Sequence, residues 1–169
     1  MENVDRSIDS VQELGAPIVD SEQVVLQFSD TVYRLALVRC KNRTDADDVF
    51  QNVFYRYLKY KPSFESLRHQ RAWFVRTTIN CSNSLLANVW RKRTTELDKN
   101  LPAEDTIDLT VYDAVLRLPQ KQKTAIHLYY YEGYTVAEIA KIMASPQGTV
   151  KSWLSRARAA LEKELKGEF

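Results

Sequence analysis

The chain has 169 residues, 44% of them hydrophobic and 27% charged, a composition typical of a soluble globular protein. No apolar run approaches the roughly 20 residues that a membrane span requires, and the polar start MENVDRSIDS does not resemble a signal peptide. The two cysteines and two histidines form no metal-binding or redox spacing. We therefore expect a cytoplasmic protein with reduced thiols, and without a metal, a cofactor or a small-molecule substrate.

The first half of the chain begins with a polar segment and continues with helical patterns. Residues 1–20 show no clear period and are expected to form a mobile tail. Apolar residues then recur at a helical spacing over 21–40. A second helix is expected over 46–60, with Thr44 or Asp45 accepting hydrogen bonds from its first amides.

A third helix completes this half of the chain. Pro62 ends the second helix, and apolar residues recur again from about 70 to 92. The resulting domain, over 21–93, is rich in aromatic residues, and we expect Trp73 to belong to its core. The scarcity of glycine and proline, four and five residues, also favours an all-α fold over a turn-rich β fold.

A second helical domain follows a break in the pattern. Residues 94–108 are polar and acidic and contain a proline, which predicts a flexible linker. The second domain is expected over 109–169. Pro119 suits the first position of the helix QKQKTAIHLYYYE, and Gly133 suits a left-handed cap at its end.

The end of the chain has the pattern of a helix-turn-helix. Thr135 and Glu138 have the spacing of a capping box, so the short helix VAEIAKIM should begin directly after Thr135. Ser145 can cap a further helix that Pro146 opens and that continues as QGTVKSWLSRARAALEKEL. Two helices joined by a tight turn are typical of DNA-binding motifs. The same hairpin also occurs in ordinary α-helical proteins.

In a DNA-binding helix-turn-helix the second helix enters the major groove, and its first residues contact the bases. Polar side chains occupy the start of this helix, whereas arginines follow where phosphate contacts are expected. The glycine there permits a close approach to DNA. The predicted contact residues are Gln147, Gly148, Thr149, Lys151, Ser152, Ser155, Arg156 and Arg158.

Charge alternates along the chain although the net charge is only +2. Residues 1–20 carry −4, 21–93 carry +7, 94–118 carry −4 and 119–169 carry +3. Each block alone is compatible with solvated helix faces. Two basic blocks on either side of an acidic connector make a nucleic-acid partner the better interpretation.

At these motifs the chain resembles a known family. RLPQKQKTAIHLYYYEGYTVAEIAKIMASPQGTVKSWLSRARAAL is similar to region four of bacterial extracytoplasmic-function sigma factors. DADDVFQNVFYRYLKY is similar to the polymerase-binding helix of region two, and RAWFVRTTIN to its promoter-melting helix. The resemblance covers about 22–165. Ala144 and Trp153 depart from the glycine and arginine that the family usually has there.

The resemblance implies a protein that docks on core RNA polymerase and directs promoter-specific initiation, in a stress or envelope response. On this reading, 21–93 is region two and 109–169 is region four. The outward face of the second helix would meet the polymerase, although a merely solvated face is the alternative. The residues carried over to that face are Asp48, Gln51, Asn52 and Tyr55.

The same resemblance assigns promoter contacts. Region four would read the minus-thirty-five element, and region two would capture unpaired bases of the minus-ten element, which requires a pocket with aromatic or polar groups. Basic residues would hold the phosphates. The minus-ten residues are Phe64, His69, Arg71, Arg76, Asn80, Arg91, Lys92 and Arg93. An anti-sigma factor is a further expected partner, and the chain is expected to be monomeric when free.

Two other classes of function stay open at this point. A self-sufficient helix-turn-helix regulator would bind duplex DNA alone, whereas a sigma factor needs polymerase. An enzyme is a distant third, because no paired carboxylates, Cys/His arrangement or Gly-rich phosphate loop stands out in the sequence.

Overall fold

The structure, a computed structural model, describes residues 15–95 and 110–167. Every regular element in these two stretches is helical, as the sequence predicts. The elements are α2 (Ser21–Cys40), α3 (Arg43–Tyr60), α4 (Leu67–Thr95), α5 (Thr110–Arg117), α6 (Gln120–Ile126), the π-helix η1 (His127–Tyr131), α7 (Val136–Ile142) and α8 (Gln147–Gly167). Within the described stretches, no helix combines the length and apolar character needed to cross a bilayer.

The helices of the first unit begin and end at identifiable caps. Asp20 caps α2 by accepting a hydrogen bond from the amide of Gln23 at 3.2 Å. The cap of α3 is Asn42, whose side-chain oxygen accepts from the amide of Asp45 at 2.8 Å. The expectation that Thr44 or Asp45 caps this helix is therefore wrong. Asn42 has the extended backbone that a cap requires, and both expected residues lie inside the helix.

Aromatic rings from all three helices form the core of the first unit. The rings of Phe28 and Phe74 are stacked with centroids 4.6 Å apart, and Phe54 and Tyr57 each lie 5.4 Å from Phe74. Trp73 meets Phe74 edge to face at 5.0 Å, which agrees with its expected place in the core. Offset and edge-to-face pairs are the arrangements that aromatic rings prefer.

The helix-turn-helix forms largely as its sequence predicts. Gly133 has φ of 75° and ends the preceding helical stretch. Thr135 and Glu138 form both hydrogen bonds of the capping box, at 3.3 and 2.8 Å. The hydroxyl of Ser145 donates to the carbonyl of Met143, so no capping bond from Ser145 to α8 is present. The expectation that Ser145 caps α8 is therefore wrong. The helix begins directly after Pro146, whose carbonyl accepts its first regular bonds, from the amides of Thr149 and Val150.

One helix of the second unit changes its winding where the sequence predicts a continuous α-helix. After Ile126 the chain forms the π-helix η1, and the amide of Glu132 donates to the carbonyl of His127 at 3.1 Å. Short π-helical segments occur often at functional sites. Glu132 follows this turn directly and is its C-terminal cap residue.

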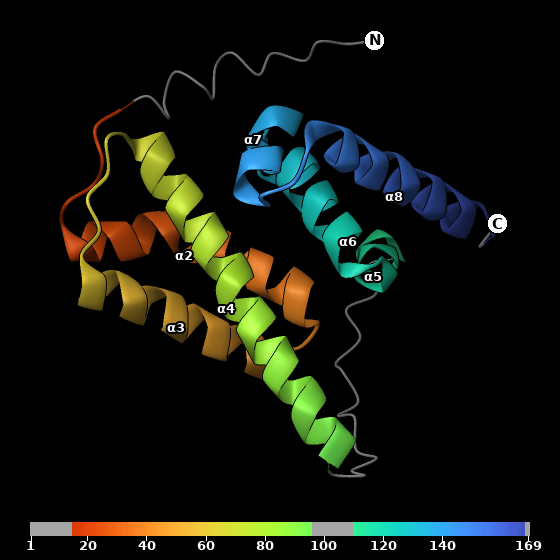
Figure 1. Cartoon of the computed structure of the whole chain (residues 1–169), viewed down its shortest axis with the longest axis horizontal. Helices are drawn as coiled ribbons and strands as arrows, with labels where there is room; N and C mark the ends of the chain where they lie inside the picture. Colours follow the sequence, from red (N-terminus) through yellow and green to blue (C-terminus); the bar gives the residue numbers. More distant parts are fainter. Residues whose placement is uncertain (1–14, 96–109, 168–169) are drawn as a thin grey trace.

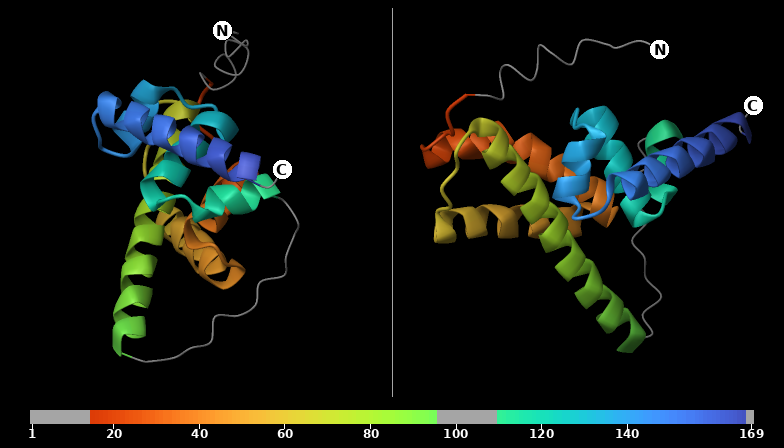
Figure 2. Two further views of the ribbon diagram at one scale, coloured as in Figure 1. Left: turned by 90° about the vertical axis from the view of Figure 1, so that its right-hand side faces the viewer. Right: turned by 45° about the horizontal axis from the view of Figure 1, so that its top comes forward.

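The two units pack against each other. In Figure 1, α5 to α8 lie together beside α2 and the first half of α4, whereas the second half of α4 extends away from both groups, as it also does in both views of Figure 2. Leu35 of α2 and Val75 and Ile79 of α4 share one buried apolar cluster with the helices of the second unit. The sequence predicts the two units but not this contact between them.

Candidate nucleic-acid interface

Helix α8 presents one polar face to solvent. Val150, Leu154 and Ala157 are buried against the rest of the second unit at a helical spacing. Thr149 is half-buried. The other predicted contact residues are all exposed, namely Gln147, Gly148, Lys151, Ser152, Ser155, Arg156 and Arg158. The sequence-based selection thus matches the solvent-exposed face of the helix.

Arg158 is held by the tyrosines of η1. Its Nε donates a hydrogen bond to the hydroxyl of Tyr130 at 2.6 Å, and its guanidinium lies 5.6 and 5.5 Å from the ring centroids of Tyr129 and Tyr130. Tyrosine rings restrict the guanidinium and attract its charge. Sequence reasoning did not select Tyr130, although the run of three tyrosines before Glu132 was visible.

A second polar face lies on α3, in the first unit. Asp48, Gln51, Asn52 and Tyr55 are exposed along one side of the helix, and the side chain of Tyr55 is 61% exposed. The opposite side of α3 is buried in the aromatic core. An exposed aromatic ring beside polar groups is a common composition for a protein-binding surface.

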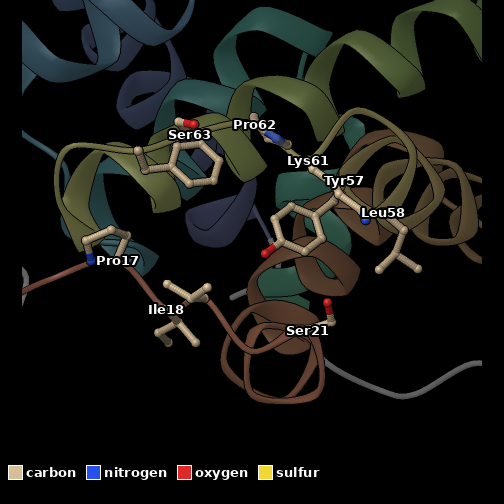
Figure 3. Close-up of a pocket in the computed structure, with 10 residues that line it drawn as sticks. Pro17, Ile18, Ser21, Tyr57, Leu58, Lys61, Pro62 and Ser63 are labelled. Atoms are coloured by element: carbon tan, nitrogen blue, oxygen red, sulfur yellow. The ribbon is translucent and has the colours of Figure 1, made fainter.

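The loop between α3 and α4 borders a cavity of about 500 Å³, drawn in Figure 3. Phe64 of this loop lines the cavity and also contacts His69 and Trp73 edge to face, at centroid distances of 5.5 and 5.9 Å. The ring of His69 is oriented by a hydrogen bond from the amide of Glu65 to its Nδ1 at 3.2 Å. The structure therefore brings Phe64 and His69 together.

The opposite wall of the cavity comes from a segment that the sequence assigns to the tail. Pro17, Ile18 and Val19 line it together with Tyr57 of α3. The segment is attached to α4, because the amide of Leu67 donates to the carbonyl of Gly15 and the side chain of Gln70 pairs with Ile18. No sequence signal identified this attachment.

The basic residues predicted along α4 fall into separate groups. Arg71 and Arg76 point toward the second unit: Arg71 pairs with Glu132 at 3.1 Å, and Arg76 donates to the carbonyl of Lys141 at 3.5 Å. Asn80 and Lys92 are exposed. The side chains of Arg91 and Arg93 lie outside the described part of the chain.

Glu132 is the centre of a buried charged cluster that joins the two units. Its carboxylate lies 3.1 Å from Arg71 of α4, 3.9 Å from Arg34 of α2 and 3.3 Å from Nε2 of His127. Burial disfavours the charged carboxylate, but His127 and Arg71 outweigh that effect and lower its pKa. The guanidinium of Arg34 also stacks on the ring of Tyr131 at 4.8 Å.

A second polar cluster joins α2 to α6. The guanidinium of the buried Arg39 donates to Ser82 and Asn83 of α4 and to Thr124 of α6, the last at 2.5 Å. Lys123 is only 1% exposed. Burial, reinforced by the charges of Lys41 and Arg39, lowers the pKa of Lys123 to about 8.

Comparison with known proteins places this architecture in a class. Residues 108–161 match the family described as sigma-70, region 4. The sigma-E factor of Haemophilus influenzae is 30% identical over 76% of this chain and 79% of its own length. The sigma factor SigW of Bacillus subtilis is 28% identical over 92% of this chain and 90% of its own. The names of both relatives designate them as extracytoplasmic-function sigma factors.

A solved structure matches as well. The sigma factor RpoE of Bartonella quintana, in complex with the anti-sigma factor NepR, is 25% identical with a TM-score of 0.75. The match covers 88% of this chain and 98% of that one. Together with these relatives, the helical fold and the helix-turn-helix identify a transcription initiation factor. The chain belongs to the family of extracytoplasmic-function RNA polymerase sigma factors. It is an alternative sigma factor, and the similarity of nearly the whole chain disfavours the self-sufficient regulator.

Proposed function

We propose that the chain binds core RNA polymerase through α3 and reads a bipartite promoter. Residues 21–93 act as region two, 94–108 as the linker and 109–169 as region four, with 1–20 as an N-terminal tail. Region four reads the minus-thirty-five element and region two the minus-ten element. The protein acts in the cytoplasm, where transcription takes place, in a stress or envelope response. It directs initiation and does not itself catalyse a reaction.

The observation that carries this proposal is the presence of two exposed polar faces on two separate units. The face on α8 has its polar residues at the start of the helix and its arginines farther along, the order that base and phosphate contacts require. The face on α3 contains Asp48, Gln51, Asn52 and Tyr55, and the exposed Arg56 and Lys59 continue it toward the end of the helix. Its mixture of acidic, amide and aromatic groups suits a protein partner.

The contacts with the minus-ten element are assigned to region two. The cavity beside Phe64 and His69 supplies aromatic walls for an unpaired base, and Arg71, Arg76, Asn80 and Lys92 follow along α4. Arg91 and Arg93 complete this set. An anti-sigma factor is a further partner, by analogy with the Bartonella quintana sigma factor that was solved with NepR. We expect the chain to be monomeric when no partner is bound.

Run-off transcription tests the proposal. Purified core polymerase from the native organism is combined with the protein on promoters of that genome, beginning with the gene's own upstream region. We expect transcripts that start at defined sites only when both proteins are present. Duplex DNA binding by the protein alone, with no complex formed with polymerase, would instead identify a regulator.

A pair of variants locates the polymerase contact. Gln51→Ala removes an exposed side chain from the α3 face, whereas Gln27→Ala makes the same change on an exposed position of α2. We expect Gln51→Ala to weaken core binding by about 1 kcal/mol, the size of an ordinary interface contact. Gln27→Ala should bind as the unmodified protein does. Equal affinities for both variants would exclude this part of the α3 face.

A further inference from the structure

Helix α8 receives a positive charge from the neighbouring helix α6, against which it packs (Figure 1). The ammonium group of Lys121, near the start of α6, lies 5.6 Å from the centroid of the Trp153 ring. Trp153 is half-buried and packs on the apolar cluster of the second unit. Its position is one at which the sequence has no arginine, although the family usually has one there. A cation is thus present beside α8 at this position, but it comes from another helix.

The same kind of contact holds Arg158 on the tyrosines of η1. Its guanidinium lies 5.6 and 5.5 Å from the ring centroids of Tyr129 and Tyr130. A cation over the face of an aromatic ring is attracted by the ring's negative face, and tryptophan is the strongest of the three aromatic residues in this respect. Lys121 and Arg158 are therefore both restrained beside the recognition helix before any ligand binds.

Trp153 and Arg158 lie at opposite edges of the buried face of α8. Five positions separate them, and at about 100° per residue they are about 140° apart around the helix axis. The buried residues Val150, Leu154 and Ala157 all fall inside this sector. The exposed polar face occupies the rest of the circumference, so each of its two borders has one restrained cation.

A helix that inserts its exposed face into the major groove has a phosphate backbone on each side. The groove is about 12 Å wide, and a helix with its side chains is about 10–12 Å across. The middle of the inserted face therefore meets the base edges, and its borders meet the two backbones. Cations at these borders suit phosphate contacts, which fix the position of the helix and carry no sequence information.

The charge of Lys121 is available for such a contact. Its side chain is exposed, and no carboxylate in the described part of the chain pairs with it. Lys166, near the other end of α8, differs because it pairs with Glu162. A cation that binds a phosphate releases counterions from the nucleic acid, and this release makes the affinity depend on salt.

We propose that Lys121 is a phosphate contact of the minus-thirty-five interface, and that Trp153 is the residue that positions it. The assignment rests on the proposed function, which places α8 in the major groove. Lys121 binds the backbone on one side of the groove, and Arg158 binds the backbone on the other. Arg156, three residues after Trp153, continues the Lys121 side toward the end of the helix.

The salt dependence of promoter binding tests the phosphate contact. Holoenzyme with each variant is bound to the promoter that run-off transcription identifies, at about 50 and about 200 mM salt. Loss of one phosphate contact lowers the slope of log affinity against log salt by about 0.9. Lys121→Ala should therefore reduce the ratio of the two affinities about 3.5-fold. Lys166→Ala, the control, should leave this ratio unchanged.

A shorter promoter separates this contact from other effects of the substitution. The fragment begins downstream of the minus-thirty-five element and carries an already unpaired minus-ten element. Lys121→Ala and the unmodified protein should bind it with the same salt slope. Full promoters that differ only in the minus-thirty-five sequence should all be weakened alike. Equal slopes on the full promoter, or a changed slope on the short fragment, would overturn the phosphate contact.

A double-mutant cycle tests the role of Trp153. Trp153→Leu keeps an apolar side chain against the core and removes the ring under Lys121, so it should weaken promoter binding. The same substitution should weaken it no further in Lys121→Ala, because the side chain that the ring positions is already absent. Additive losses would make Trp153 a core residue only and overturn its positioning role.

Restoration of a charge at the same edge completes the test. Trp153→Arg in the Lys121→Ala background should return the salt slope to that of the unmodified protein, and the aliphatic part of the arginine can cover the apolar surface. Circular dichroism monitors helix content. If Trp153→Arg lowers it, the cycle with Trp153→Leu decides the role of Trp153.

Two further outcomes distinguish this inference from the proposed function. Unmodified holoenzyme that binds promoters regardless of their minus-thirty-five sequence would contradict the proposed function. Sequence-dependent binding with an unchanged slope in Lys121→Ala would contradict only the assignment of Lys121. Weaker binding of the folded Lys121→Ala variant to core polymerase alone would identify a polymerase contact and overturn the assignment as well.

Discussion

The side-chain amide of Gln70 pairs with both backbone polar groups of Ile18: its Oε1 accepts from the Ile18 amide and its Nε2 donates to the Ile18 carbonyl, both at 2.8 Å. Gln70 is 0% exposed, so this pairing takes place away from solvent. It attaches the segment before α2 to the first turns of α4. That segment forms one wall of the cavity beside Phe64.

Replacement of Gln70 should detach this wall. Gln70→Glu removes the donor to the Ile18 carbonyl and places a carboxylate in a buried site, so we expect the free energy of unfolding to fall by about 1–3 kcal/mol. Gln51→Glu, the same substitution at an exposed position, should change it by less than about 0.5 kcal/mol. Urea unfolding measures both. Equal losses would mean that the pairing with Ile18 contributes nothing to stability.

The recognition helix offers a comparison of two kinds of contact. Lys151 lies near the start of α8 and Arg158 farther along, beside Tyr130. Loss of a base contact costs about 1–3 kcal/mol and changes the preference at one position, whereas loss of a phosphate contact weakens all sequences alike. We therefore expect Lys151→Ala to change which minus-thirty-five sequences are preferred. Arg158→Ala should lower transcription evenly and reduce its salt dependence.

A library of minus-thirty-five elements, transcribed by holoenzyme at two salt concentrations, measures these effects. Tyr130→Phe serves as a graded control, because it keeps the ring under Arg158 and removes the hydroxyl that accepts its hydrogen bond. It should resemble Arg158→Ala with a smaller loss. If Arg158→Ala reorders the promoters while Lys151→Ala lowers them all equally, the opposite end of the helix faces the bases.

Lys123 should make stability depend on pH. Burial lowers its pKa to about 8, against about 10.4 for an unfolded lysine. The folded state therefore carries the full cost of the buried charge below about pH 8, and this cost is relieved as the pH rises toward 10.4. Cys40 has the opposite effect on stability. Burial raises the pKa of its thiol to about 11, so the folded state becomes less stable as the pH rises above about 9.

Lys123→Met separates the contribution of Lys123 to the pH dependence of stability from that of Cys40. It removes the buried charge and keeps an unbranched apolar chain, so we expect it to be more stable than the unmodified protein near pH 7. The difference between the two proteins should shrink between about pH 8 and pH 9, where Lys123 begins to lose its proton. Thermal unfolding at several pH values measures this, and a difference that is constant with pH would contradict the assigned titration.

Ala144 occupies a left-handed position in the turn between α7 and α8, with φ of 48°. A residue with a Cβ atom pays about 1–2 kcal/mol in this conformation, and glycine does not. Ala144→Gly should therefore raise the free energy of unfolding, by up to about 1 kcal/mol after the greater entropy of the unfolded glycine is subtracted. Ala159→Gly, on the exposed side of α8, should lower it by about 1 kcal/mol. If both substitutions change the free energy of unfolding in the same direction, the left-handed backbone at Ala144 does not determine the effect of glycine there.

Local signals account for what the sequence could predict. The capping box at Thr135, the left-handed Gly133 and the exposed face of α8 all depend on residues close together in the chain. The cap at Asn42 was missed because several capping residues stand in a row, and only the backbone conformation distinguishes them.

Contacts between distant segments could not be predicted in this way. Arg71 and Glu132 are 61 positions apart, and nothing in the helical period of either segment indicates that they meet. An arginine on an exposed-looking face has the same pattern whether it faces water, DNA or another domain. The promoter contacts assigned to Arg71 and Arg76 from the family therefore gave no indication that both are directed at region four in the free chain.

The π-helix gives one short tyrosine run two different neighbours. A π-turn holds about one residue more than the α-turn it replaces, so it fits an additional side chain into one turn without redirecting the residues that follow. In this chain the additional residue allows Tyr131 to lie under Arg34 of the first unit while Tyr130 bonds Arg158 of the recognition helix. Deletion of one tyrosine from His127–Tyr131 would restore regular winding, keep the direction of Glu132 and remove one of these two contacts.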